Sequence, residues 1–211
     1  MKLHIYEHCP FCVRGQMIFG LKNIPFEKVI IMEGDAETPT RMVGRKMVPI
    51  LEKDDGSFMG ESMDIVKYVD GLSGERITDA PIDPQIEAWA KAATGPLFKL
   101  AIPRFTQGEF PELATPDARA AYLAREEKAF GSMKTLMAST PELLDEMNQK
   151  LRELEPLVAD REQIDTSDFI LFPLLRSLSI VKGIEFGPSV TGYTVNMAVQ
   201  SKVSLLSDQA R

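Results

Sequence analysis

Apolar residues near the start of the chain alternate between strand-like and helix-like spacing. Leu3 to Tyr6 forms a short strand-like run. Pro10 then opens a segment whose apolar residues recur every three or four positions, as on one face of a helix: Phe11, Met17, Ile18 and Leu21. The pattern predicts a strand followed by a helix that begins at Pro10 and ends at residues 23–25.

The next segments repeat this alternation. Residues 26–31 form a β-branched run, which predicts a second strand. Thr38 and Pro39 suit an N-cap and the first position of a short helix, and Gly44 suits its end. These residues predict a second helix from about 38 to 44.

A hairpin and a third helix follow. Val48–Leu51 and Phe58-Met59 flank Asp54-Asp55-Gly56, a sequence typical of a hairpin turn. Residues 62–72 then place Ile65, Val66 and Val69 on one helical face. The complete order is strand, helix, strand, helix, strand, strand, helix, which favours a mixed four-stranded sheet with helices on both faces.

The pattern changes after residue 72. Residues 73–84 read SGERITDAPIDP, without periodicity, and indicate a linker. Everything after Pro84 favours helices, with new starts at Thr115-Pro116, at Thr140-Pro141, and at Asp165 with Asp168. We therefore predict an α/β domain at 1–72, a linker at 73–84 and an all-α bundle at 85–211.

Composition limits the classes of partner. The chain has 211 residues, of which 44% are hydrophobic and 26% charged, as in an ordinary globular protein. Its formal charge is -7, with acidic residues in excess both before and after residue 72, so no nucleic-acid partner is expected. We also see no run of about 18 apolar residues and no leader-like start, and expect a cytoplasmic protein without membrane contact.

The only two cysteines lie in the heptapeptide YEHCPFC, residues 6–12. A bridge across two intervening residues closes too small a loop to stabilise a fold. Cys9 stands at the start of the predicted helix, where free amides favour a thiolate, and a pKa of about 6 would make it roughly 90% ionised at pH 7. Cys12 lies one turn inside, so we expect Cys9 to attack and Cys12 to resolve.

Two other uses of the cysteines stay open at this point. Structural zinc normally takes four ligands, and the chain offers only His4 and His8 besides the cysteines. His4 lies in a strand and His8 adjoins Cys9, an awkward set for a closed tetrahedral site. A buried, inert cysteine pair is the second alternative. The position of the motif, at a helix start after a strand, favours redox chemistry without a metal.

Two dipeptides accompany the motif. Val48-Pro49 starts the third strand and resembles the cis-proline loop of thioredoxin folds, which lies beside the active-site sulfur. Glu61-Ser62 opens the third helix, whose free amides could hold a carboxylate. From Ser62 alone, an ordinary helix cap is the favoured interpretation.

Together these features resemble a known family. Cys9-Pro10-Phe11-Cys12, Val48-Pro49 and Glu61-Ser62, followed by a linker and a helical domain, are similar to glutaredoxins built on the glutathione transferase architecture. The resemblance extends over essentially the whole chain, including residues 17–25, 38–44 and 171–176. It implies a thioredoxin-like first domain, a glutathione-dependent thiol-disulfide oxidoreductase and a monomer.

The resemblance also implies roles for individual residues. Cys9 is the nucleophile and Cys12 the resolving thiol. Val48 contacts the cysteinyl part of glutathione through its main chain, and Pro49 is the adjacent cis-proline. Glu61 and Ser62 hold the γ-glutamyl end. The expected partners are glutathione, as co-substrate, and glutathionylated or disulfide-containing proteins.

One position departs from the family. Many small glutaredoxins carry a basic residue three positions before the nucleophile, where this chain has Tyr6. The thiolate must then depend on helix amides or on a basic group that the sequence does not place. Three basic residues, Arg41, Arg45 and Lys46, are candidates for the glycyl carboxylate of glutathione.

Other questions also stay open. Four aromatic residues of the helical part could pack in the core, which we expect for most of them, or could line a cleft: Trp89, Phe98, Phe105 and Tyr122. A glutathione transferase that conjugates electrophiles and a non-catalytic interaction protein are the alternative functions, because a fold does not by itself fix an activity.

Overall fold

A computed structural model describes residues 1–211. Its sheet has four strands: β1 (Lys2–Ile5), β2 (Glu27–Ile30), β3 (Ile50–Glu52) and β4 (Phe58–Met59). They lie in the order β2-β1-β3-β4, with β1 parallel to β2 and antiparallel to β3, and β3 antiparallel to β4. The mixed four-stranded sheet is therefore confirmed.

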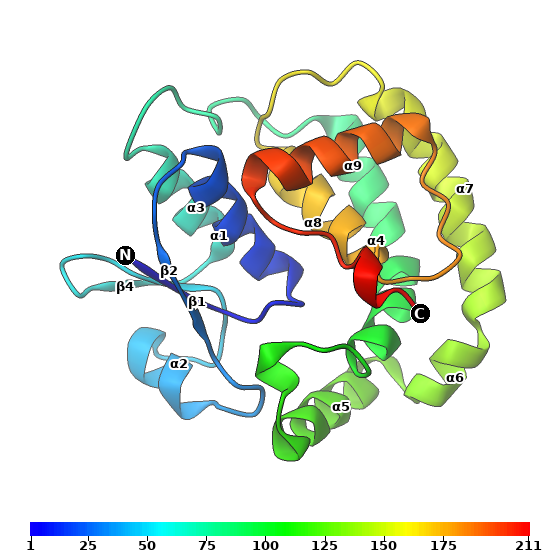
Figure 1. The fold of residues 1–211 in the computed structure, drawn as a ribbon, viewed down its shortest axis with the longest axis horizontal. Helices are drawn as coiled ribbons and strands as arrows, with labels where there is room; N and C mark the ends of the chain where they lie inside the picture. The colour runs from blue at the N-terminus through cyan, green and yellow to red at the C-terminus, as the bar shows by residue number, and fades with distance from the viewer.

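Helices cover both faces of the sheet. α1 (Pro10–Leu21) and α3 (Ser62–Asp70) pack together, while the short α2 (Glu37–Val43) lies away from them against β3 and β4, as Figure 1 shows. This arrangement places the first turn of α1 directly after the end of β1. The sheet thus fixes where Cys9 stands.

The predicted start of α2, with Thr38 as N-cap and Pro39 as first helical residue, is wrong by two residues. The helix begins at Glu37, so Thr38 is not its N-cap and Pro39 is its third residue. Asp35 explains the shift. Its side chain accepts a 2.9 Å hydrogen bond from the amide of Thr38, one of the free amides in the first turn of the helix. The predicted end is confirmed, since Gly44 adopts a left-handed φ of 79° that favours glycine.

The remainder of the chain is helical. It contains two short 3-10 turns, η1 (Pro111–Leu113) and η2 (Ser207–Gln209), and six α-helices: α4 (Pro84–Phe105), α5 (Pro116–Phe130), α6 (Met133–Ala138), α7 (Thr140–Val158), α8 (Asp168–Leu178) and α9 (Pro188–Ser201). Figure 1 shows α8 in the middle of this bundle, between α4 and α9. None of the helices combines the length and apolar character that crossing a membrane requires.

The predicted helix starts are only partly right. Thr115 does cap α5, accepting from the amide of Ala118. Thr140 is instead the first residue of α7, and its hydroxyl accepts from Arg104. Asp165 lies before the start of α8 at Asp168, with Ser167 in the capping position. Arg104 thus engages the Thr140 side chain, and Arg161 with the Ser167 amide engages that of Asp165.

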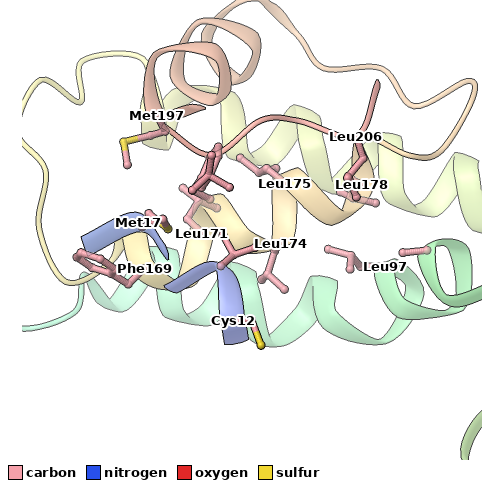
Figure 2. Close-up of a cluster of buried hydrophobic side chains, with 14 of the residues drawn as sticks. Cys12, Met17, Leu97, Phe169, Leu171, Leu174, Leu175, Leu178, Met197 and Leu206 are labelled. Carbon is pink, nitrogen blue, oxygen red and sulfur yellow. The ribbon is translucent and has the colours of Figure 1, made fainter. Parts of the chain in front are cut away.

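The helical part packs directly on the first helix of the sheet. α1 contacts α3 on one side and both α8 and α9 on the other. Figure 2 shows Cys12 and Met17 of α1 in one cluster with Phe169, Leu171 and Leu174 of α8. Residues 71–83, between α3 and α4, hold no helix or strand. The domain limits at 72 and 85 remain a prediction, because the hydrophobic core runs through both parts.

Candidate active site

Cys9 stands at the N-terminus of α1. It occupies the N-cap position in an extended conformation, with Pro10 as the first helical residue. The amides of Cys12 and Phe11 lie near its sulfur and help to lower its pKa. Free amides at a helix start carry a partial positive charge, so this position favours a thiolate.

The two thiols differ in exposure and acidity. Cys9 is partly exposed, whereas Cys12 is fully buried and accepts a 3.4 Å hydrogen bond from the amide of Tyr6. The Cys12 side chain donates to Cys9 and lowers the pKa of Cys9 to about 7; burial opposes the shift, and the charge of His8 assists it. Burial raises the pKa of Cys12, as does its hydrogen bond to Cys9. Cys9 is therefore the more exposed and the more acidic of the two thiols.

The lowered pKa leaves a large share of Cys9 as thiolate. A pKa of about 7 makes roughly half of the thiol ionised at pH 7. Burial limits the shift, because it disfavours the charged form even beside the helix amides.

His8, the residue before Cys9, is held by a carboxylate of the helical part. Glu112 Oε1 lies 2.7 Å from His8 Nδ1 and accepts a 2.9 Å hydrogen bond from the His8 amide. Glu112 is completely buried, and His8 is 5% exposed. Burial alone would raise the pKa of Glu112, but the hydrogen bond with His8 outweighs it and the pKa is lowered. The carboxylate is therefore ionised at neutral pH.

A cleft of about 370 Å³ opens over Cys9, between the sheet domain and the helical part. Ten of its fifteen lining residues are hydrophobic, as is usual for a small-molecule cleft, and Lys46, Arg125 and Glu126 add charged groups to the wall. The sheet domain supplies Tyr6, His8, Cys9, Pro10, Phe11, Lys46, Met47 and Val48, and the helical part supplies Phe98, Ile102, Phe105, Tyr122, Arg125, Glu126 and Phe130.

The four aromatic residues of the helical part divide between core and cleft. Trp89 packs in the core and donates from Nε1 to the Lys150 carbonyl. Phe105 and Tyr122 are almost fully buried and yet also line the cleft, as does Phe98. The expectation that most of the four pack in the core is confirmed, and three of them line the cleft as well, so packing and cleft lining are not exclusive.

The structure brings Val48 to Cys9, since both line the cleft. The Val48-Pro49 bond is cis, as the resemblance implied. Ser62 begins α3, is 8% exposed and accepts a 3.3 Å hydrogen bond from Arg14 Nη1. Glu61 precedes it with a φ of 60° and forms an ion pair with Arg45.

The three candidate basic residues have different surroundings. Arg41 faces Glu37 on its own helix, at 3.6 Å. Arg45 pairs with Glu61. Lys46 lines the cleft and has no acidic side chain within ion-pair distance. Of the three, Lys46 is the one placed to meet an anion in the cleft.

Tyr6 does not replace the missing basic residue by its own charge. Burial raises its pKa above the usual range, so the phenol stays neutral. The ring lies parallel to that of His8, with centroids 5.8 Å apart. Arg14 of α1 and Arg176 of α8 supply positive charge near Cys9 instead. The negative charge of a Cys9 thiolate favours the charged form of both guanidinium groups.

Sequence reasoning missed Arg14, Glu112 and Arg176 as parts of this site. Glu112 and Arg176 lie more than 100 residues after the motif, and nothing in their local sequence separates them from ordinary helix residues. Arg14 could have been found, since it lies on α1 one turn beyond Pro10. No group of three or more His, Cys, Asp or Glu side chains in the chain could hold a metal ion.

Comparison with known proteins gives two family matches and full-length relatives. Residues 85–210 match the glutaredoxin 2 C-terminal domain, and residues 3–76 match the glutathione S-transferase N-terminal domain. Glutaredoxin 2 of Escherichia coli K12 is 45% identical over 214 residues, covering 100% of both chains.

Solved structures give the same result. The crystal structure of glutaredoxin 2 from Salmonella typhimurium in complex with glutathione has a TM-score of 0.96 at 43% identity, covering 100% of this chain and 98% of that one. A glutathione transferase from Phanerochaete chrysosporium has a TM-score of 0.74 at 12% identity, covering 94% and 96%. The second match concerns the fold alone.

Proposed function

Because the chain belongs to the glutaredoxin 2 family and is a glutathione-dependent thiol-disulfide oxidoreductase, we propose that Cys9 is its nucleophile and Cys12 its resolving thiol. One observation carries this assignment. Cys9 is a partly exposed thiol with a lowered pKa at a helix N-terminus, and Cys12 is a buried thiol with a raised pKa one turn later.

The reaction follows from this asymmetry. The Cys9 thiolate attacks the sulfur of glutathione in a glutathionylated substrate, a Cys9-glutathione disulfide forms, and the substrate leaves as a thiolate that takes up a proton. A second glutathione thiolate then attacks this mixed disulfide, releasing oxidised glutathione and the Cys9 thiolate. With a protein disulfide, Cys12 attacks the mixed disulfide instead and leaves a Cys9-Cys12 bond, which two glutathione molecules reduce.

Glutathione would bind in the cleft over Cys9. The Salmonella relative was crystallised with glutathione, and four observations support the corresponding site here. Val48 lines the cleft, and Pro49 follows it through the cis bond. Ser62 begins a helix whose first amides can receive the γ-glutamyl carboxylate, with Glu61 beside it to meet the amino group. Lys46 lines the cleft where it could pair with the glycyl carboxylate.

The substrates, the cellular compartment and the oligomeric state follow from the same reaction. The substrates would be glutathionylated and disulfide-containing proteins, reached through the open side of the cleft. Glutathione reduction of the enzyme requires a reducing compartment, which the cytoplasm provides. We propose that the protein acts there as a monomer, because one chain supplies every residue of the site described above.

Exchange of each cysteine for serine tests the assignment. Cys9→Ser should abolish glutathione-dependent reduction of a glutathionylated peptide. Cys12→Ser should retain this activity but lose most of the reduction of a protein disulfide. Full activity of Cys9→Ser on the glutathionylated peptide would contradict the assignment, and so would equal loss of both activities in Cys12→Ser. Conjugation of an aromatic electrophile that survives in Cys9→Ser would indicate a separate transferase activity.

A further inference from the structure

The two residues before Cys9 are held by buried ionisable groups of the helical part. Glu112 Oε1 accepts hydrogen bonds from both the amide and the ring Nδ1 of His8. Arg176 Nη1 donates a 3.0 Å hydrogen bond to the carbonyl oxygen of Glu7. The loop that presents the nucleophile therefore takes its position from residues that lie more than 100 positions later.

Glu112 has no other partner for its charge. It is completely buried, its second carboxylate oxygen has no hydrogen-bond partner, and no lysine or arginine lies within ion-pair distance. Taking a carboxylate out of water is unfavourable by several kcal/mol unless an opposite charge or good hydrogen bonds compensate. His8 is the only side chain that hydrogen-bonds the carboxylate, and the charge of Arg176 acts on it at longer range.

His8 in turn is enclosed by aromatic rings. The ring centroids of Tyr6, Phe105, Phe110 and Tyr122 lie 4.8 to 5.8 Å from its own. The His8 ring nevertheless lines the cleft in which Cys9 lies. A charge in surroundings of this kind is poorly screened and acts strongly on a neighbouring sulfur.

We propose that Glu112 is a positioning residue for Cys9, holding a protonated His8 ring at the wall of the cleft in place of the basic side chain that Tyr6 does not supply. The inference rests on the proposed role of Cys9. Other titratable or charged side chains face residues 6–9 and the rings around His8, and the test variants leave them unchanged: Tyr6, Glu7, Arg14, Glu33, Tyr122, Arg125 and Arg176.

The direction in which Glu112→Gln shifts the pKa of Cys9 distinguishes this positioning role from a direct effect of the Glu112 charge. Glu112 is an anion near Cys9, so if it acted only by its own charge, Glu112→Gln would favour the thiolate and lower the pKa of Cys9. If it acts by holding a protonated His8, the same substitution removes the positive charge of the ring from the site. The pKa of Cys9 would then rise.

The test follows the alkylation of Cys9 by iodoacetamide from pH 5 to 10, in reduced protein without glutathione, with mass spectrometry to identify the modified cysteine. Glu112→Gln and His8→Gln should each raise the midpoint by about one unit, which lowers the rate at pH 6 about tenfold. The double variant should shift no further than His8→Gln alone. Because no substrate is present, this result is independent of the catalytic assignment.

A matched control is Glu155→Gln. Glu155 is a carboxylate of the helical part that accepts two backbone hydrogen bonds, from Ser189 and Val190, and takes no part in the cleft. It should lower stability without moving the Cys9 midpoint. An unchanged or lowered midpoint in Glu112→Gln would overturn the proposal, as would shifts that add in the double variant. If Glu112→Gln fails to fold, an unchanged midpoint in His8→Gln overturns it equally.

Discussion

The guanidinium of Arg176 donates a hydrogen bond to the carbonyl oxygen of Glu7, which precedes it by 169 residues and lies two residues before Cys9. A second hydrogen bond, from Arg176 Nε to the Ser204 carbonyl at 2.8 Å, fixes the other side of the group. Arg176 is only 4% exposed. Burial lowers its pKa, but an arginine stays charged at any physiological pH, so this is a permanent positive charge behind the motif.

Arg176→Met should therefore lower the stability of the fold and raise the pKa of Cys9. Two partly buried carbonyls lose their donor, which costs roughly 1 kcal/mol for each hydrogen bond. The pKa of Cys9 should rise, because a nearby cation is lost. Urea unfolding measures the first effect and iodoacetamide alkylation the second. Arg176→Lys is the control, because it keeps the charge but not both hydrogen bonds. It should therefore lose stability while the pKa of Cys9 stays nearly unchanged. An equal rise of this pKa in both variants would show that the charge of Arg176 does not act on Cys9.

The reactivity of Cys9 should depend on pH with a midpoint near 7. Its pKa is lowered to about 7, and only the thiolate attacks. The rate of deglutathionylation of a small peptide, measured in single turnover, should fall about tenfold per pH unit below this midpoint and level off above it. Cys12→Ala tests the cause, since it removes the side-chain donor that supplies the largest stabilisation of the thiolate, and the midpoint should rise. A midpoint near 8.5 in the unmodified protein would contradict the predicted acidity.

Ser62 and Lys46 should affect glutathione binding rather than the acidity of Cys9. Ser62→Ala and Lys46→Met each remove one contact proposed for a glutathione carboxylate. We expect the KM for glutathione to rise by roughly three- to tenfold in each, the effect of losing one hydrogen bond to a charged group. Arg41→Met is the control, because Arg41 faces Glu37 and does not line the cleft. A matching rise in Arg41→Met would show that the surface charge as a whole attracts glutathione.

Asp70 should stabilise the junction between α3 and the linker. Its buried carboxylate lies 2.9 Å from Lys22 Nζ and accepts from the amides of Ile77 and Thr78. Burial opposes ionisation, but the hydrogen bonds from Lys22 and Thr78 outweigh it and lower the pKa of Asp70 to about 2. Asp70→Asn should reduce the free energy of unfolding by about 3 kcal/mol at pH 7, because the charge of Lys22 loses its carboxylate partner and keeps only the carbonyls of Ser73 and Glu75.

The pH dependence of this effect has a definite sign. The folded-state pKa of about 2 lies below the ordinary value of 3.8, so the ionised carboxylate contributes its full stability above about pH 4. That contribution is lost as the pH falls towards 2. The difference between Asp70→Asn and the unmodified protein in urea unfolding should thus shrink below pH 4. Asp79→Asn, at an exposed carboxylate 3.8 Å from Arg76, should change stability by less than about 0.5 kcal/mol at any pH.

Gly20 should tolerate no side chain. A Cβ at this position would lie 1.8 Å from the carbonyl oxygen of Ser201, at the contact between α1 and the end of α9. Because that neighbour is backbone, the two helices must separate, and we expect Gly20→Ala to lose more than about 2 kcal/mol in urea unfolding. Gly192→Ala is the control, since a Cβ there meets nothing and alanine favours a helix by about 1 kcal/mol. Equal effects of the two substitutions would contradict the close approach.

Much of the first domain could be predicted because its signals are local. The start of α1 at Pro10 follows from a proline after a short strand, and the end of α2 at Gly44 from a residue suited to positive φ. The starts at Thr38 and Thr140 were wrong for the opposite reason. Whether a threonine caps a helix depends on which groups lie near it in the fold. Asp35 accepts from the amide of Thr38, and Arg104 donates to the hydroxyl of Thr140.

By itself the sequence determined the two cysteines at a helix start, the strand and helix order, and the aromatic residues available to a cleft. These depend on spacing along the chain. Only the tertiary structure decided which charges surround Cys9, because Glu112 and Arg176 reach residues 7 and 8 through the packing of the helical part on α1. The strength of these interactions depends on their burial, and no local pattern at Tyr6 carries that information. The basic group missing from the motif is thus replaced by charges that folding brings to it.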